Sequence, residues 1–157
     1  MNALIALMRR PPMSSDWLPF KTGQRFTHET SLSSESIKTF ATLVGDANPL
    51  HHDEELARSS QFGALIASGV QTSSIIASWA ASIIAEHCAS VGLEIMYKFE
   101  APVFANEALR IDLEVSDLIH KPRLDRYVIT FDCKMTKIQS QIIAVSGYAK
   151  GLLSQKL

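Results

Sequence analysis

Alternation of hydrophobic and polar residues dominates the second half of the chain. Residues 93–100, 109–115 and 127–136 each alternate one by one, and residues 142–152 form a fourth, more apolar segment. A period of two is typical of a strand with one buried face, so these segments predict four strands of an antiparallel sheet. A shorter alternation at residues 24–30 predicts a fifth strand.

The segment after residue 30 has the period of an α-helix instead. Hydrophobic residues recur at intervals of three and four from Ile37 to Val44, which predicts an amphipathic helix. Ser33 or Ser34 is suited to cap the beginning of this helix. Gly45 is suited to end it.

The longest helical segment runs from Val70 to about Cys88 and is apolar on nearly all sides. A short helix over residues 53–60 precedes it. One buried helix followed by four strands favours an α+β fold, in which a five-stranded antiparallel sheet wraps around one long central helix. Residues 16–157 are expected to form this single domain, and residues 1–15 an N-terminal extension.

Composition and charge exclude several classes of partner. The chain has 157 residues and a formal net charge of -1, with no run of basic residues, so no nucleic-acid partner is expected. The apolar residues 1–8 are too few to cross a membrane, and serines interrupt residues 70–85, so no membrane partner is expected either. Cys88 and Cys133 are widely separated, which is typical of buried, reduced thiols in a cytoplasmic protein.

The expected sheet also predicts an oligomer. A sheet of five strands leaves an edge strand open, and pairing with a second copy would cover it. We therefore expect a homodimer, with a dimer of dimers as a further possibility.

The segment from Gly45 to His51 carries the candidate chemistry. Asp46 and His51 are an acid and a base five residues apart, and Asn48-Pro49 between them breaks any helix. A rigid loop must therefore aim the two side chains, and Asn48 and Pro49 are assigned to shaping that loop. The simpler interpretation is that Asp46 caps a turn and His51 lies on the surface.

A metal site is disfavoured in this loop. Asp46, His51, His52 and Asp53 are all potential ligands, but adjacent histidines in an extended segment point in opposite directions. We instead expect His52 at the surface, and Asp53 as the cap of the short helix that follows.

Several of these residues resemble the signature of the MaoC-like, or (R)-specific enoyl-CoA hydratase, family. They are Phe40, residues 45–51, Asp53 and residues 66–70, within a resemblance that extends from about Gly23 to the C-terminus. The resemblance implies a hotdog fold, which is a sheet wrapped around one helix. It also implies that Asp46 and His51 are the catalytic dyad, that Gly69 and Ser68 form the oxyanion and substrate-binding position, and that the Gly69 amide donates to the thioester oxygen.

Two positions depart from the family pattern. Ser68 stands where the family often has histidine, and Ala77 stands where it often has a serine that orients the aspartate. Ser73, Ser74 or Ser78 is a candidate to replace that serine.

The resemblance implies a hydratase or dehydratase that adds water across the C2=C3 bond of an enoyl thioester. Its substrate would be an acyl-CoA or an acyl-carrier thioester, with no separate cofactor because CoA is part of the substrate. Candidate contacts for the CoA nucleotide are scattered basic residues, for which solvated surface charge is the simpler role: Lys98, Lys121, Arg123 and Arg126. Two alternatives remain open, a thioesterase that uses Asp46 as its base and a non-catalytic acyl-thioester-binding subunit.

Overall fold

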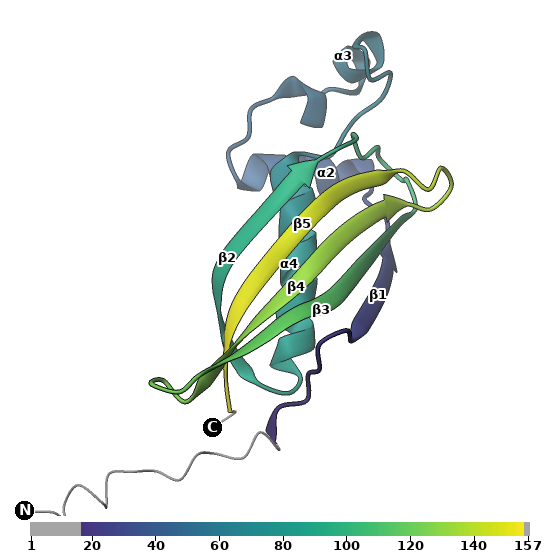
Figure 1. Cartoon of the computed structure of the whole chain (residues 1–157). Coiled ribbons are helices and arrows are strands. Elements are labelled where there is room, and N and C mark those ends of the chain that lie inside the picture. The colour runs from purple at the N-terminus through teal and green to yellow at the C-terminus, as the bar shows by residue number, and fades with distance from the viewer. Residues whose placement is uncertain (1–16, 156–157) are drawn as a thin grey trace, which may run out of the picture.

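The computed structural model describes residues 17–155, and its largest element is a single five-stranded sheet (Figure 1). The strand order is β1-β3-β4-β5-β2, and every pair of neighbours is antiparallel. The bounds are β1 Arg25–Thr30, β2 Ala89–Phe99, β3 Leu109–Lys121, β4 Arg126–Lys137 and β5 Ile143–Ser154. All five predicted strands are confirmed. The expected N-terminal extension lies outside the described residues.

One long helix, α4 (Gly69–Ala85), crosses the inner face of this sheet (Figure 1). The predicted architecture, a sheet around one central helix, is therefore confirmed. The helix ends three residues earlier than predicted, because the amides of His87 and Cys88 both bond to the carbonyl of Ile84. That tight turn leads directly into β2.

The remaining helices gather at one end of the sheet (Figure 1). They are α2 (Ser34–Leu43), the single 3₁₀ turn η2 (Pro49–His51) and α3 (Glu54–Ser59). The Ser33 hydroxyl caps α2 by accepting from the Ser36 amide at 3.1 Å. This group of helices places the loop that carries Asp46 and His51 near the beginning of α4.

The alternation of the strands determines the core. Every second residue of β4 points inward, so Ile129, Phe131 and Met135 are fully buried in the same cluster as Ile76 and Ile84 of α4. Removal of this apolar surface from water is the main favourable contribution to folding.

Both cysteines belong to this core, which leads to a prediction of low reactivity. Cys88 and Cys133 form no disulfide and are 2% and 1% exposed. Burial raises the pKa of the Cys133 thiol to about 11, so at pH 8 it stays protonated, and the thiolate is the reactive form. We expect a chromogenic thiol reagent to label neither cysteine in the folded protein and both after denaturation in urea. Rapid labelling of the folded protein would contradict this placement.

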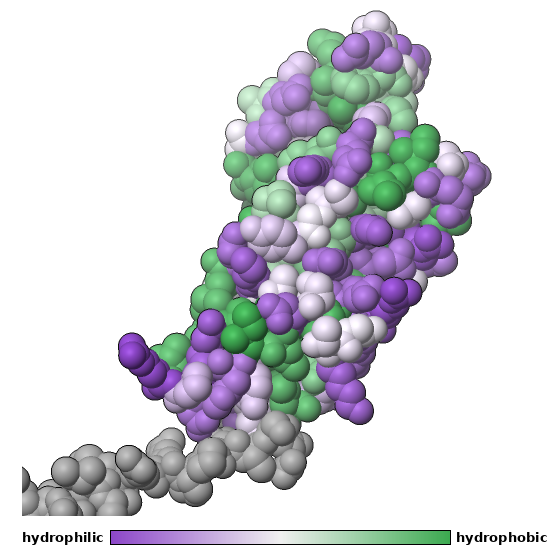
Figure 2. All heavy atoms as spheres, viewed as in Figure 1, coloured by the Kyte–Doolittle hydropathy of each residue, from purple (hydrophilic) through white to green (hydrophobic). Residues whose placement is uncertain are grey.

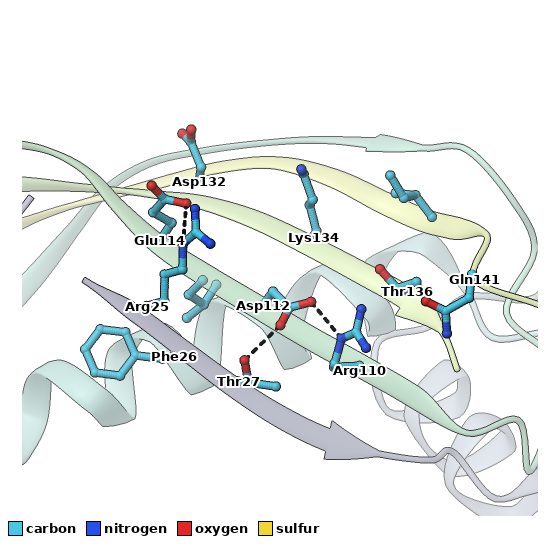
Figure 3. A pocket seen from close by; sticks show the side chains of 12 residues that line it. Arg25, Phe26, Thr27, Arg110, Asp112, Glu114, Asp132, Lys134, Thr136 and Gln141 are labelled. Carbon is cyan, nitrogen blue, oxygen red and sulfur yellow. Dashed lines mark hydrogen bonds and ion pairs between the residues drawn. The ribbon is translucent and has the colours of Figure 1, made fainter. Parts of the chain in front are cut away.

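The outer face of the sheet is mostly hydrophilic (Figure 2). It is hollowed between β1, β3 and β4 into a pocket of about 460 Å³ (Figure 3). Charges in this pocket pair with one another, since Arg25 contacts Glu114 and Arg110 contacts Asp112, each at 2.9 Å. These side chains therefore stabilise the sheet surface and have their charges neutralised locally.

The edge strand β2 is unusually apolar for its exposure. Four of its large hydrophobic side chains are more than half exposed: Val91, Leu93, Ile95 and Phe99. The opposite edge, β1, has six residues and exposes mainly polar ones. The two edges of the sheet therefore differ in chemistry.

Candidate active site

The candidate loop begins with a sharp reversal at the end of α2. Gly45 has a φ of 73°, in the left-handed region that glycine adopts without a side-chain clash. The amide of Asp46 then bonds back to the carbonyl of Ala41 at 2.9 Å. This bond anchors the backbone of Asp46 to the end of α2.

The turn at Asn48-Pro49 then fixes both reactive side chains. The Asn48 side-chain oxygen accepts from the amide of Leu50 at 3.1 Å and so caps η2, whose first residue is Pro49. The backbone N–H of Asn48 donates to Oδ1 of Asp46 at 3.0 Å. One short turn thus orients the Asp46 carboxylate and places His51 at its far end.

Asp46 and His51 are close together. His51 Nε2 lies 3.7 Å from Asp46 Oδ2, and the two side chains are 8% and 28% exposed. His51 Nδ1 lies 2.8 Å from the carbonyl oxygen of Ile66, which can only accept, so Nδ1 carries a proton. In the neutral ring Nε2 is therefore the unprotonated nitrogen on the side of Asp46. A separation of 3.7 Å is too long for a direct hydrogen bond and short enough for both groups to bind one water molecule.

The two residues after His51 have structural roles. Asp53 caps α3 by accepting from the amides of Glu55 and Leu56, as predicted. The surface position expected for His52 is wrong, because its ring is partly buried and Nε2 lies 2.5 Å from the backbone carbonyl of Asp46. His52 therefore holds the loop from its second side.

Gly69 and Ser68 form the amino end of α4. The Ser68 hydroxyl accepts from the amide of Gln71 at 3.2 Å and is buried, so it caps the helix. The first intrahelical bond runs from the Thr72 amide to the Ser68 carbonyl, which leaves the Gly69 N–H ahead of it. Because the helix dipole is positive at this end, the Gly69 amide is suited to stabilise a developing oxyanion.

These residues line two adjoining pockets. A groove of about 690 Å³ contains Asp46, His51 and Gly69 and is bounded by the small side chains of α4. A second pocket of about 360 Å³ also contains His51 and Gly69, and its lining is mostly apolar but includes Thr72 and Glu100. The lining of the second pocket includes Phe62, Ile66, Ala67, Pro102, Val103 and Val145. The acid, the base and the helix amino end therefore share one hollow.

None of the candidate serines of α4 replaces the serine that the family often has at position 77. Ser73, Ser74, Ala77 and Ser78 line the groove with Asp46, so this face of α4 does lie beside the carboxylate. The Ser73 hydroxyl instead donates to the carbonyl of Gly69 at 2.7 Å. Within residues 17–155 no seryl hydroxyl bonds to Asp46, and its carboxylate is oriented by the Asn48 amide.

The four basic residues proposed for the CoA nucleotide do not line either pocket. Lys121, Arg123 and Arg126 belong to the β3–β4 hairpin, at the end of the sheet opposite α3 (Figure 1). Lys98 precedes Phe99 in β2, and successive residues of a strand point to opposite faces of the sheet. Among the described residues, no three histidine, cysteine or acidic side chains are grouped as metal ligands.

The contact between Gly69 and Phe99 could not be seen in the sequence. Phe99, at the end of β2, lines both pockets, and its ring packs directly on Gly69. The two residues are 30 positions apart, and nothing in the local pattern of either predicts the contact.

The fold and the site together define a sheet wrapped around one helix, with an acid–base pair beside the amino end of that helix. The chain belongs to the MaoC-like dehydratase family, since the family described as "MaoC like domain" matches residues 18–131. This result confirms the family resemblance found in the sequence.

Curated relatives in this family are dehydratases. The chain is 28% identical over 134 residues to the mitochondrial 3-hydroxyacyl-[acyl-carrier-protein] dehydratase of Arabidopsis thaliana, covering 85% of this chain and 77% of the relative. It is 31% identical over 99 residues to the 3-hydroxybutyryl-CoA dehydratase of Methylorubrum extorquens, covering 63% of this chain and 62% of the relative. These relatives are hydro-lyases by name.

Solved structures confirm the hotdog fold. The (R)-hydratase from A. caviae involved in PHA biosynthesis matches with a TM-score of 0.75 and 25% identity, over 85% of this chain and 97% of that one. The unliganded R-hydratase PhaJ1 from Pseudomonas aeruginosa matches in fold with a TM-score of 0.78 and 23% identity, over 89% and 86% of the two chains. Among the described residues, no helix has the length and apolar character needed to cross a membrane.

Proposed function

We propose that this protein catalyses the reversible addition of water to an enoyl thioester, giving an (R)-3-hydroxyacyl thioester. The observation that carries the proposal is the 3.7 Å separation of Asp46 and His51 in a hollow that also contains the amino end of α4. The relatives named as acyl-carrier-protein and CoA dehydratases support both thioester carriers as substrates.

The proposed reaction assigns each group a charge to stabilise or a proton to move. A water bound between Asp46 and His51 attacks C3, and one of the two side chains takes its proton. Electron density moves onto the thioester oxygen, where the Gly69 amide stabilises it. The pair then returns a proton to C2, and the reverse sequence removes water. No separate cofactor takes part, because CoA or the acyl carrier belongs to the substrate.

The substrate also fits the shape of the hollow. The two pockets meet at His51 and Gly69, so a thioester whose carbonyl lies at Gly69 extends in both directions. The apolar pocket beyond Ile66 suits the acyl chain. The groove along α4 suits the arm that links the thioester to CoA or the acyl carrier. The amide groups of this arm can hydrogen-bond to the seryl hydroxyls of that helix.

The assay that tests this function follows two products at once. Incubation with crotonyl-CoA is expected to remove the conjugated C=C absorbance without releasing free thiol, which a chromogenic thiol reagent measures. Release of thiol would favour the thioesterase alternative. Thermal stabilisation by the thioester without any reaction would favour a non-catalytic binding protein.

We further propose that the active form is a homodimer paired through β2. This strand is a long edge with its backbone groups and apolar side chains exposed, whereas natural proteins usually protect such edges. A second copy running antiparallel would cover both and would close the open side of the groove formed by Ile95 and Phe99. A dimer of dimers and a cytoplasmic location stay predictions.

Light scattering after size exclusion tests the dimer. Wild-type protein is expected at twice the chain mass at micromolar concentration, and Leu93→Asp at the chain mass, because a carboxylate would then be buried in an apolar seam. Ile119→Asp is the matched control. Ile119 is an exposed aliphatic residue of the same size as Leu93, but it lies on the β3–β4 hairpin. A wild-type monomer would refute the β2 interface.

A further inference from the structure

The amino end of α4 and the end of β2 are in unusually tight contact. A side-chain carbon built on Gly69 would lie 2.9 Å from Cζ of Phe99 and 3.0 and 3.1 Å from its two Cε atoms. The first of these distances is shorter than non-bonded carbon atoms tolerate. A side chain at position 69 would therefore force the Phe99 ring to move, although the backbone of Gly69 does not need the left-handed region.

Phe99 also occupies the junction of the two pockets. It lines both of them, together with His51 and Gly69, and is 58% exposed despite its position on the inner face of the sheet. Its neighbour on the adjacent strand is Val145, which lines the second pocket but not the groove. Four residues earlier on the same face of β2, Ile95 lines the groove but not the second pocket. The Phe99 ring is thus the part of β2 that separates the two pockets where they meet the acid–base pair.

We propose that Phe99 is a positioning residue that forms the wall of the channel at the reacting carbons and presses the thioester against the Gly69 amide. This inference rests on the proposed function, since it assigns a role within the same site. A substrate that passes from the groove to the apolar pocket must cross the ring. The ring therefore limits how far the carbonyl can move from the helix amino end.

This role predicts a loss in turnover rather than in binding. Small displacements of reacting groups cost up to about 10²-fold in rate, so Phe99→Ala is expected to lower kcat on crotonyl-CoA by about 10- to 100-fold while KM changes much less. Phe99→Leu restores an apolar wall and is expected to retain most of the activity. Ile119→Ala is the control, because Ile119 is an exposed apolar residue of β3 that lines neither pocket and lies outside the β2 seam.

The double variant gives the sharpest test. Gly69→Ala is expected to inactivate the protein because the new methyl group displaces the Phe99 ring. Removing that ring removes the collision, so Gly69→Ala with Phe99→Ala should be no slower than Phe99→Ala alone. Size exclusion and thermal melting of each variant are the controls that test whether the dimer and the fold are retained.

Each result decides the proposal. Non-additive losses, with retained activity in Phe99→Leu, support it. Losses that multiply in the double variant, or an Ile119→Ala loss equal to that of Phe99→Ala, overturn it while leaving the hydratase function in place. A wild-type protein that hydrates no enoyl thioester would instead refute the proposed function itself.

Discussion

Asp46→Asn and His51→Ala are each expected to lower the rate of enoyl-thioester hydration by about 10²- to 10⁴-fold, the usual contribution of a positioned acid or base. Asparagine keeps the shape of Asp46 and an oxygen for the Asn48 amide, but it cannot take a proton at neutral pH. Alanine at position 51 removes Nε2 altogether. The measurement is kcat on crotonyl-CoA, with circular dichroism and thermal melting to show that the fold is unchanged.

A second histidine–aspartate pair in the chain provides the matched control. His120 Nε2 lies 3.7 Å from Asp125 Oδ1, the same separation as in the candidate dyad, but this pair sits on the β3–β4 hairpin outside both pockets. His120→Ala is expected to leave kcat within about twofold, because proximity of an acid and a base matters only at the substrate. Most activity surviving in both Asp46→Asn and His51→Ala would end the dyad assignment.

Gly147→Ala is expected to cost about 3 kcal/mol of the free energy of unfolding, the upper end of typical overpacking penalties. Gly147 lies in β5 opposite Tyr97 of β2, and a side-chain carbon there would lie 2.0 Å from the backbone oxygen of Met96. Backbone cannot give way as a flexible side chain can, so β2 must separate from β5. Urea denaturation measures the change.

Gly151→Ala in the same strand is the control for this effect. Its added carbon would lie 3.7 Å from the side chains of Ile129 and Ile84, which is ordinary contact. We expect its free energy of unfolding to change by less than about 1 kcal/mol. Equal destabilisation by the two substitutions would show that loss of glycine itself, and not the collision with Met96, is responsible.

The fold could be predicted because its information is local. Alternation along β3 and β4 identified both strands and their buried faces, and the all-round apolar character of α4 identified the central helix. The end of α4 was misplaced by three residues, because residues 86–88 contain no glycine or proline that marks a helix end, while their backbone already turns toward β2.

The site could be predicted only in part. The spacing of Asp46 and His51 placed both on one kinked loop, and the family resemblance implied that the two act together. The groups that complete the site come from elsewhere: the Ile66 carbonyl fixes the His51 tautomer, and Phe99 closes the pocket over Gly69. Both contacts depend on how distant segments pack, and neither leaves a pattern in its own sequence.

The most direct test is mass analysis of crotonyl-CoA after incubation with the wild-type protein and with Asp46→Asn. A carboxylate and an imidazole that share one water beside a helix amino end should give a thioester heavier by one water with wild type, and almost none of it with the variant. Unchanged crotonyl-CoA, free CoA with crotonate, or equal hydration by both proteins would contradict the account.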